Sequence, residues 1–553
     1  MTTETTTQAP VEFPIEWGDP SDEQLFWFQD NLHFPHPQTP LNGTLFQTAF
    51  EIGASAAISK LSMPISGLRT TMQNGYLFLA PVPVHGSPEE MEARFGEMQR
   101  LTMELAPTIL QDWRETFEPQ VEEAAARILN FDYAGSSTAE VAAFVVTFKQ
   151  ALTDVWDIHM RVNIPVMNAV FGLEHFLGEV LGEEAVSQAR QLLQGFPNKS
   201  VALGQAYWDL SRWIRSTEGL ADVILAARVH NGEIELEDHA VAEEFRTRFQ
   251  TFLDEFGWRS DVFAEVGHPS WHEDPSTPIT QLKEYVRKDD GDNPFEAHQQ
   301  QAADRDRLTE ELAARLPEEA QPQFRGMLGM AQQYVPIAED HNFTIDQKFS
   351  TVIRHGVVQL GDKLVADGVV SNREDVCYLT HEEIGQLAAG GDSSGCSDLV
   401  RTRRQDFLNQ RSIKPPPGIG TPPPADMPPD PLVTKFFGFG VQQDDDASTV
   451  TGYPASNGVV TGVAKIVLTL DEADKLEPGD VMVCRMTMPA WTPLFGIVGA
   501  VVSDSGGPLS HCAIVAREYG VPCVAGTQVG TSVLKDGMTV RVDGATGIIQ
   551  ILD

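Results

Sequence analysis

Residues 505–518 read Ser-Gly-Gly-Pro-Leu-Ser-His-Cys-Ala-Ile-Val-Ala-Arg-Glu. The glycines and the proline predict a turn, and the residues from His511 onward predict a short helix that begins at the histidine. The first turn of a helix offers free backbone N–H groups and the positive end of the helix dipole, which suit a bound phosphate. A neutral imidazole at that position can also attack a phosphoryl group and carry it. The segment therefore predicts a protein that moves phosphoryl groups by way of His511.

Short segments with β character and glycine turns between them surround this helix. They cover residues 459–467, 480–484 and 499–502, and residues 538–544 suggest a closing hairpin. We therefore expect a compact β/α module over residues 447–553.

The chain before this module is predicted to be mostly α-helical. Capping boxes at 87–90 and 137–140 precede apolar residues at helical spacing, and helical periodicity dominates to about residue 260 and again over 296–390. We expect a disordered Thr-rich N-terminus at 1–16, a mostly α-helical body at 17–413 and a proline-rich, acidic linker at 414–446.

Composition excludes several classes of partner. The formal net charge of −40 argues against non-specific binding to nucleic acid and against docking on anionic membranes. The five cysteines form no CxxC pair, so the sequence predicts neither a metal site nor a disulfide framework. The chain shows no signal peptide and no run of about 18 apolar residues, so we expect a cytoplasmic protein.

Five motifs in order carry a resemblance to a known family; they lie at residues 452–462, 478–483, 487–495, 506–524 and 542–547. The module resembles the swivelling phosphohistidine domain of the phosphoenolpyruvate-utilising enzymes. The resemblance implies that His511 carries the phosphate, that Ser510 supplies a hydroxyl beside it and that Arg517 is the family's arginine. Gly506 and Gly507 would cradle the phosphate. Pro508 and Cys512 depart mildly from the family pattern.

The body resembles, more loosely, the acceptor-binding domains of rifampin phosphotransferase and of proteins like phenylphosphate synthase. The segments that carry this resemblance are 33–41, 74–76, 271–275 and 373–380. The implied fold is multidomain, with a large mostly α-helical substrate-binding body and a C-terminal β/β/α swivelling domain.

Relatives that use ATP carry an ATP-grasp domain before this body, whereas here the body begins near Trp17 and no glycine-rich phosphate loop precedes it. The resemblance thus implies that a separate ATP-grasp subunit binds ATP and Mg²⁺, and that this chain alone binds neither. The proline-rich linker would let His511 visit both sites.

The acceptor site is harder to place from sequence. The candidates on one predicted helix are His159 and Trp156. The others are Tyr76, the pair His33 and His36 in a proline-rich turn, and His272, which precedes two carboxylates. Each has an ordinary structural reading as a core or turn residue. Arg259, Arg354 and Arg373 could clamp a phosphate or form structural ion pairs.

Three functions remain open on the sequence. The first is a subunit that phosphorylates a small aromatic hydroxyl compound of the phenol or cresol type, with an ATP-grasp partner. The second is a rifampin-type phosphotransferase that acts on an antibiotic or another hydroxyl compound. The third is a phosphocarrier or regulatory protein that passes phosphate from His511 to another protein.

Overall fold

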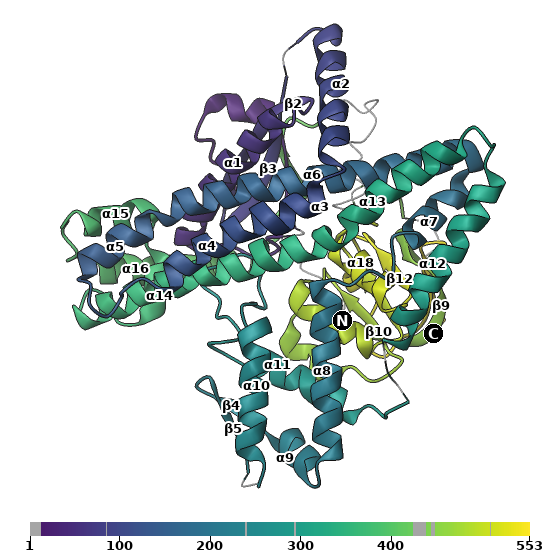
Figure 1. Ribbon diagram of the computed structural model, residues 1–553. Helices are drawn as coiled ribbons and strands as arrows, with labels where there is room; N and C mark the ends of the chain where they lie inside the picture. The colour runs from purple at the N-terminus through teal and green to yellow at the C-terminus, as the bar shows by residue number, and fades with distance from the viewer. Residues whose placement is uncertain are drawn as a thin grey trace, which may run out of the picture.

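The computed structural model describes residues 13–31, 33–84, 86–237, 240–291, 293, 295–423, 438, 440–443, 448–508 and 510–552. These residues form a large helical body and a C-terminal domain built around one mixed sheet (Figure 1). This arrangement confirms the multidomain fold class expected from the sequence.

Three long helices form the frame of the body: α6 (Phe148–Leu181), α13 (Gln321–His341) and α14 (Ser350–Ala366). A π-helical segment, η3 (Asn342–Phe349), joins α13 to α14. The continuous helix made by α13, η3 and α14 forms one long arm beside α6 (Figure 1). The other helices of the body are η1 (Pro20–Gln24), α1 (Pro40–Lys60), α2 (Pro88–Leu105), α3 (Ile109–Asp112), η2 (Trp113–Phe117), α4 (Glu118–Leu129), α5 (Thr138–Val146), α7 (Glu183–Gln191), α8 (Lys199–Ser216), α9 (Leu220–Ala226), α10 (Ala242–Phe256), α11 (Ser276–Arg287), α12 (Glu296–Arg315), η4 (Arg373–Tyr378), α15 (His381–Ala388) and α16 (Cys396–Gln410).

The two predicted capping boxes are confirmed. Ser87 caps α2 and Ser137 caps α5, and in each case a glutamate three residues later returns a bond to the backbone N–H of the cap. Each box satisfies two N–H groups that the first turn of a helix would otherwise leave free.

Residues 138–181 are long and apolar enough to span a membrane by length and composition alone. The buried residues of α6 include Leu152, Val155, Val162 and Leu173, and α6 packs against α1 and α13. A helix in the core of a globular domain passes the same length and composition test, and we read this segment as such a helix.

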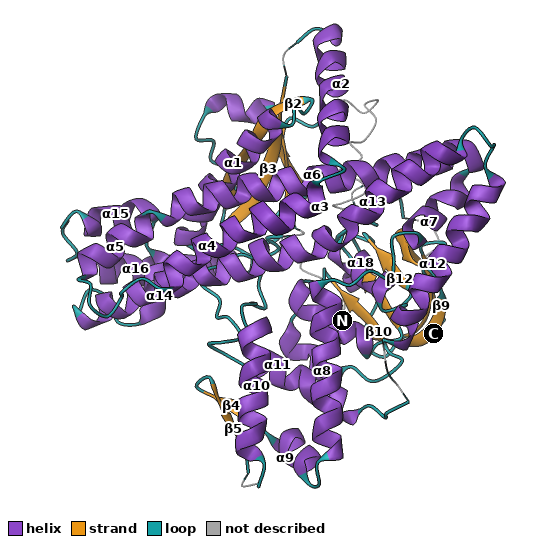
Figure 2. Cartoon of the chain, in the orientation of Figure 1, coloured by secondary structure: helices purple, strands orange, loops and turns teal. Residues whose placement is uncertain are grey.

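The body also contains a four-stranded sheet in the order β2-β3-β1-β6, which Figure 2 shows beside α1. The strands are β1 (Phe26–Gln29), β2 (Ile65–Gln73), β3 (Tyr76–Pro83) and β6 (Gly418–Gly420), and a separate hairpin joins β4 (Arg228–His230) to β5 (Glu233–Glu235). Because β6 pairs antiparallel with β1, the body extends past the boundary expected at residue 413. Residues 418–420, which the sequence predicts to be part of the linker, belong to this sheet.

Two other boundary expectations fall partly outside the described residues. Most of the proline-rich and acidic linker, at 424–437, 439 and 444–446, lies outside them, as do residues 1–12 of the predicted disordered N-terminus. Of the remaining N-terminal residues, Phe13 packs edge-on against Phe78 and the Glu16 N–H donates to the Gln73 side chain. Residues 13–16 therefore lie against the sheet of the body.

The C-terminal domain is an eight-stranded sheet in the order β7-β14-β13-β9-β10-β11-β12-β8. Strands β9 to β12 run parallel, and the remaining pairs are antiparallel. Its elements are β7 (Thr449–Thr451), β8 (Tyr453–Ser456), β9 (Val459–Ile466), η5 (Leu470–Lys475), β10 (Val481–Cys484), η6 (Pro489–Gly496), β11 (Ala500–Ser503), α18 (His511–Glu518), β12 (Cys523–Ala525), α19 (Gly530–Val533), β13 (Thr539–Asp543) and β14 (Ile548–Ile551). The predicted strands, the closing hairpin and the helix that begins at His511 are all confirmed.

The C-terminal domain is docked on the body, in the angle between α12–α13 and the lobe made by α8, α10 and α11 (Figure 1). The Gln281 side chain donates to the Ala490 carbonyl at 2.7 Å, and the Tyr285 hydroxyl donates to the Pro493 carbonyl at 3.2 Å. Gly204 of α8 lets the domain approach closely, because a Cβ atom there would collide with the Tyr519 hydroxyl. The docked position brings η6 and α18 against the body.

Candidate active site

His511 is the first residue of α18, at the end of the loop that follows β11. Gly506 takes a φ of 91°, which favours glycine, and the backbone of Ser510 is extended, as at a helix N-cap. The Ser510 hydroxyl donates to the Gly507 carbonyl at 2.8 Å. Ser510 thus closes the glycine turn, and its hydroxyl bonds the loop rather than the imidazole beside it.

Two threonines hold the imidazole of His511. Thr487 Oγ1 lies 3.2 Å from Nδ1, and Thr492 Oγ1 lies 3.2 Å from Nε2. A hydroxyl can donate or accept, so the pair satisfies either neutral tautomer. Burial lowers the pKa of His511 to about 3. The imidazole is therefore neutral near pH 7, which is the form that attacks phosphorus.

Arg517 stabilises the loop that precedes His511 by bonding to its backbone. Its guanidinium donates to the carbonyl of Pro508 at 2.8 Å and to that of Ala455 at 2.9 Å. Burial, together with nearby Arg190, lowers the pKa of Arg517 to about 10. Arg517 thus ties the loop to β8 by hydrogen bonds to backbone.

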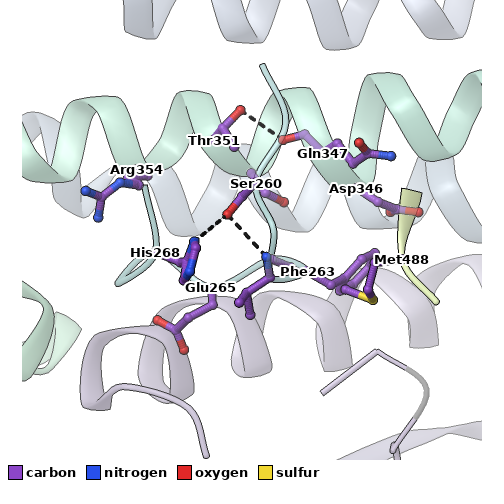
Figure 3. Close-up of a pocket in the computed structure, with 12 residues that line it drawn as sticks. Ser260, Phe263, Glu265, His268, Asp346, Gln347, Thr351, Arg354 and Met488 are labelled. Atoms are coloured by element: carbon purple, nitrogen blue, oxygen red, sulfur yellow. Dashed lines mark hydrogen bonds between the residues drawn. The ribbon is translucent and has the colours of Figure 1, made fainter. Parts of the chain in front are cut away.

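A small pocket lies where the C-terminal domain meets the body (Figure 3). One wall is the loop from Ser260 to His268, and another is the face of η3 and α14 that carries Asp346, Gln347, Thr351 and Arg354. Met488 of the C-terminal domain completes the lining. Because Met488 directly follows Thr487, the pocket adjoins the segment that holds His511.

Two of the predicted acceptor-site histidines lie beside this pocket. His33 packs against Phe263, a lining residue, and its Nδ1 is 2.9 Å from Asp30. Burial opposes its charge, yet Asp30 raises the pKa of His33 above its usual value. His159 Nε2 is 3.2 Å from Oδ1 of Asp346, which also lines the pocket.

His36 lies within electrostatic range of the docked domain. Burial lowers its pKa, and the positive charges of Arg485 and Arg411 and the neighbouring His268 lower it further. Arg485 directly follows β10, so a cation of the C-terminal domain lies within electrostatic range of this turn.

The other predicted acceptor residues have structural roles. Tyr76 is buried in the sheet of the body and donates to the Ile413 carbonyl at 2.8 Å. Trp156 packs edge-on against Phe50 and lines a different hollow, and the ring of His272 packs at a tilt against that of Trp258. Tyr76, Trp156 and His272 do not line the pocket described here, because other contacts fix their side chains, and their part in an acceptor site stays a prediction.

The three candidate phosphate clamps are also engaged. Arg354 is buried between Glu273 and Glu374, which raise its pKa despite burial, and Arg373 lies 3.2 Å from Asp362. Arg259 donates to the Phe256 carbonyl and stacks over Phe343. Burial lowers the pKa of Arg259 to about 9.

Sequence reasoning missed Thr487, Thr492 and Met488 as site residues, although all three lie in a motif that signalled the domain. It also missed His268, His341 and Asp346 of the body. His268 Nδ1 lies 3.1 Å from the Ser260 hydroxyl within the pocket (Figure 3). No local motif marks these residues, so only the packing of distant segments reveals them.

Comparison with known protein families supports both parts of the architecture. Residues 476–547 match the mobile domain of PEP-utilising enzymes, and residues 159–339 match the fourth domain of rifampicin phosphotransferase. These matches confirm the resemblance inferred from the motifs.

Curated relatives extend the match over nearly the whole chain. Chondramide synthase cmdD of Chondromyces crocatus is 31% identical over 98% of this chain and 14% of its own length. The uncharacterized phosphotransferase YvkC of Bacillus subtilis is 25% identical over 96% of this chain and 62% of its own. Rifampicin phosphotransferase of Bacillus subtilis is 26% identical over 80% of this chain and 50% of its own. The chain thus spans less than two thirds of each of these relatives.

Proposed function

We propose that this chain, a relative of the PEP-utilising enzymes and of the rifampicin phosphotransferases, carries a phosphoryl group on His511 and delivers it to a hydroxyl group bound by the helical body. The observation that carries the proposal is the environment of His511. Its imidazole is neutral and held at both nitrogens, and Met488, next to one of the two threonines, lines a pocket of the body.

In the first half-reaction, ATP and Mg²⁺ bind at an ATP-grasp site on a partner subunit. An imidazole nitrogen of His511 attacks the β-phosphorus of ATP, the bond to the α-phosphate breaks with its electrons going to AMP, and water removes the γ-phosphate as inorganic phosphate. The C-terminal domain would leave the body for this step and return charged, by way of the linker.

In the second half-reaction, the oxygen of an acceptor hydroxyl attacks the phosphorus on His511. The P–O bond forms and the P–N bond breaks, the electron pair returns to the imidazole, and the proton of the hydroxyl leaves to a base. His268 lines the pocket and is the candidate for that base. Splitting the reaction keeps water and nucleotide away from the acceptor site.

The acceptor in this proposal is a small aromatic hydroxyl compound of the phenol or cresol type. Val262, Phe263, Ala264 and Met488 give the pocket an apolar side, while Glu265, His268 and Asp346 give it polar groups that could orient a hydroxyl. A protein of this kind would act in the cytoplasm, where ATP is available.

A rifampicin-type acceptor is the second candidate. It is favoured by the match of residues 159–339 to the fourth domain of rifampicin phosphotransferase. The docked pocket encloses only about 10 Å³, so an acceptor of either class would enter only after the C-terminal domain withdraws Met488.

Chemical charging tests the proposal without the partner. The full chain is treated with phosphoramidate, which phosphorylates histidine directly, and is then mixed with phenol, 4-cresol or rifampicin while ³¹P NMR follows the phosphorus. We expect acid-labile phosphohistidine in the wild type, its loss from the His511 position in His511→Asn, and transfer to one acceptor class. A chain that charges at His511 but transfers to no small molecule would contradict the enzyme proposal and favour a phosphocarrier.

A further inference from the structure

His159, His341 and Asp346 form a buried cluster at the side of the pocket. Each offers one ligand atom, and the three atoms lie within 4.8 Å of one another. The side chains come from two helical segments that are distant in sequence, α6 and the junction of α13 with η3. Two imidazoles and a carboxylate are a ligand set that first-row transition metals prefer.

The geometry of the pair His159–Asp346 fits two ligands of one ion. Nε2 and Oδ1 are 3.2 Å apart, and two metal–ligand bonds of about 2.1 Å at about 100° would place ligand atoms at about this separation. Asp346 Oδ1 is buried and accepts no hydrogen bond of good geometry among the described residues, although Nε2 of His159 lies 3.2 Å away. A buried carboxylate oxygen without a hydrogen bond is costly, so this oxygen points to a missing ligand.

The third ligand is already oriented. Nδ1 of His341 lies 2.8 Å from the Ile337 carbonyl, to which an N–H at that nitrogen donates. This bond leaves the lone pair on Nε2, which is how the ring of a metal-binding histidine is usually fixed. The ring of His341 packs edge-on against that of His159, with 4.8 Å between their centroids.

A chain of amides orients the carboxylate. Asn342 donates to Oδ2 of Asp346 at 3.1 Å, and Gln347 donates to the Asn342 side chain at 2.8 Å. All three residues lie in η3. The second oxygen of Asp346 is thereby fixed, and Oδ1 remains for an ion.

The π-helical turn explains why His341 and Asp346 meet. They are five residues apart, which in an α-helix of 3.6 residues per turn would place them about 140° apart around the axis. A π-turn closes bonds from i to i+5 and so brings residues at this spacing to one side. Such turns frequently occur at functional sites.

We propose that His159, His341 and Asp346 bind one divalent first-row transition ion, of the Zn²⁺ or Mn²⁺ class, whose open coordination position faces the pocket. Asp346 lines that pocket (Figure 3), so the ion would lie where an acceptor can reach it. Resting on the proposed function, we assign this position to the acceptor hydroxyl, whose oxygen the ion would bind as a Lewis acid. The sequence predicts no metal here, because the two histidines are far apart in the chain and match no ligand spacing.

Cobalt substitution tests the site. The purified full chain is stripped with a chelator and titrated with Co²⁺, whose visible absorption reports the ligand field, and Zn²⁺ binding is measured by calorimetry. We expect one ion per chain, at least 100-fold weaker binding in His341→Gln and in Asp346→Asn, and about 10- to 100-fold weaker binding in Asn342→Ala, which spares the ligands. His272→Gln, which removes a histidine outside the cluster, should bind as the wild type does.

Circular dichroism of each metal-free variant shows whether that variant folds. If a ligand variant does not fold, the weaker ion binding expected of Asn342→Ala still tests the site. Stoichiometric binding that survives in the double variant His341→Gln/Asp346→Asn overturns the site, as does a wild type that binds no ion.

Adding phenol to the Co²⁺ protein should shift its spectrum. An unchanged spectrum in a chain whose His511 does transfer phosphate to phenol overturns the acceptor role alone, and a failed transfer with intact Co²⁺ binding counts against the proposed function instead.

Discussion

Thr487 Oγ1 lies 3.2 Å from Nδ1 of His511, and the residue that follows Thr487 enters the pocket of the body. This contact links the candidate phosphate carrier to the candidate acceptor site through one peptide unit. When the C-terminal domain leaves the body, Met488 leaves the pocket together with His511, because both belong to that domain.

The first prediction concerns the two hydroxyls at the imidazole. Thr487→Val or Thr492→Val keeps the shape of the side chain but removes one hydrogen bond, which is worth about 1 kcal/mol, so the rate of His511 phosphorylation should fall about five- to tenfold. The measurement is the initial rate of acid-labile phosphate formation. Thr461→Val, on the exposed face of β9, should leave the rate unchanged. A pair of threonine variants with wild-type rates would refute the assigned role.

The second prediction concerns protonation of His511. Its folded pKa of about 3 lies below the usual value of 6.5, so the group contributes stability that is present above pH 6.5 and is lost as pH falls towards 3. Two-dimensional NMR of the imidazole should show no titration of His511 between pH 5.5 and 8. The rate of charging by phosphoramidate should show no inflection from His511 in that range. A titration midpoint near 6.5 would show that the ring is exposed to solvent.

The third prediction concerns a buried carboxyl group. Burial raises the pKa of Glu339 to about 7, and the Ser200 hydroxyl donates to it at 2.5 Å. Because the folded pKa exceeds the unfolded one, its stabilising contribution is full below about pH 4.5 and is lost as pH rises through 7. Glu339→Gln, which can still accept from Ser200, should be more stable than the wild type by about 3 kcal/mol at pH 8 and by about 2 kcal/mol at pH 6. Thermal unfolding at both pH values measures the difference, and a gap that shrinks with rising pH would contradict the assignment.

The fourth prediction concerns docking of the C-terminal domain. A methyl group in Gly204→Ala would collide with the Tyr519 hydroxyl and with the ring of Phe295, whereas alanine favours the helix itself by about 1 kcal/mol. The body should therefore remain folded while the docked state is weakened by about 1–3 kcal/mol. Transfer of phosphate from phosphorylated His511 to the acceptor should slow about tenfold, whereas the rate at which His511 itself is phosphorylated should not change.

Small-angle scattering should show a more extended Gly204→Ala chain. The matched control is Gly326→Ala in α13, where an added Cβ meets open space. If Gly204→Ala transfers phosphate at the wild-type rate and keeps its scattering profile, the interface described here is not the one used for transfer.

Local patterns in the sequence determined much of this protein. The capping boxes at Ser87 and Ser137, the strand segments of the C-terminal domain and the start of α18 at His511 all follow from neighbouring residues, since caps, turns and alternation act over a few positions. The place of the candidate phosphate carrier, at the start of a helix, could therefore be predicted before the fold was known.

Contacts between distant segments decided the rest. Residues 418–420 look like linker but pair with β1, and Tyr76 looks like a binding residue but bonds the Ile413 carbonyl. His159 meets His341 and Asp346 because a π-turn changes the side of the helix on which Asp346 lies. Such meetings depend on how whole helices pack against one another, so no spacing along the chain could have indicated them.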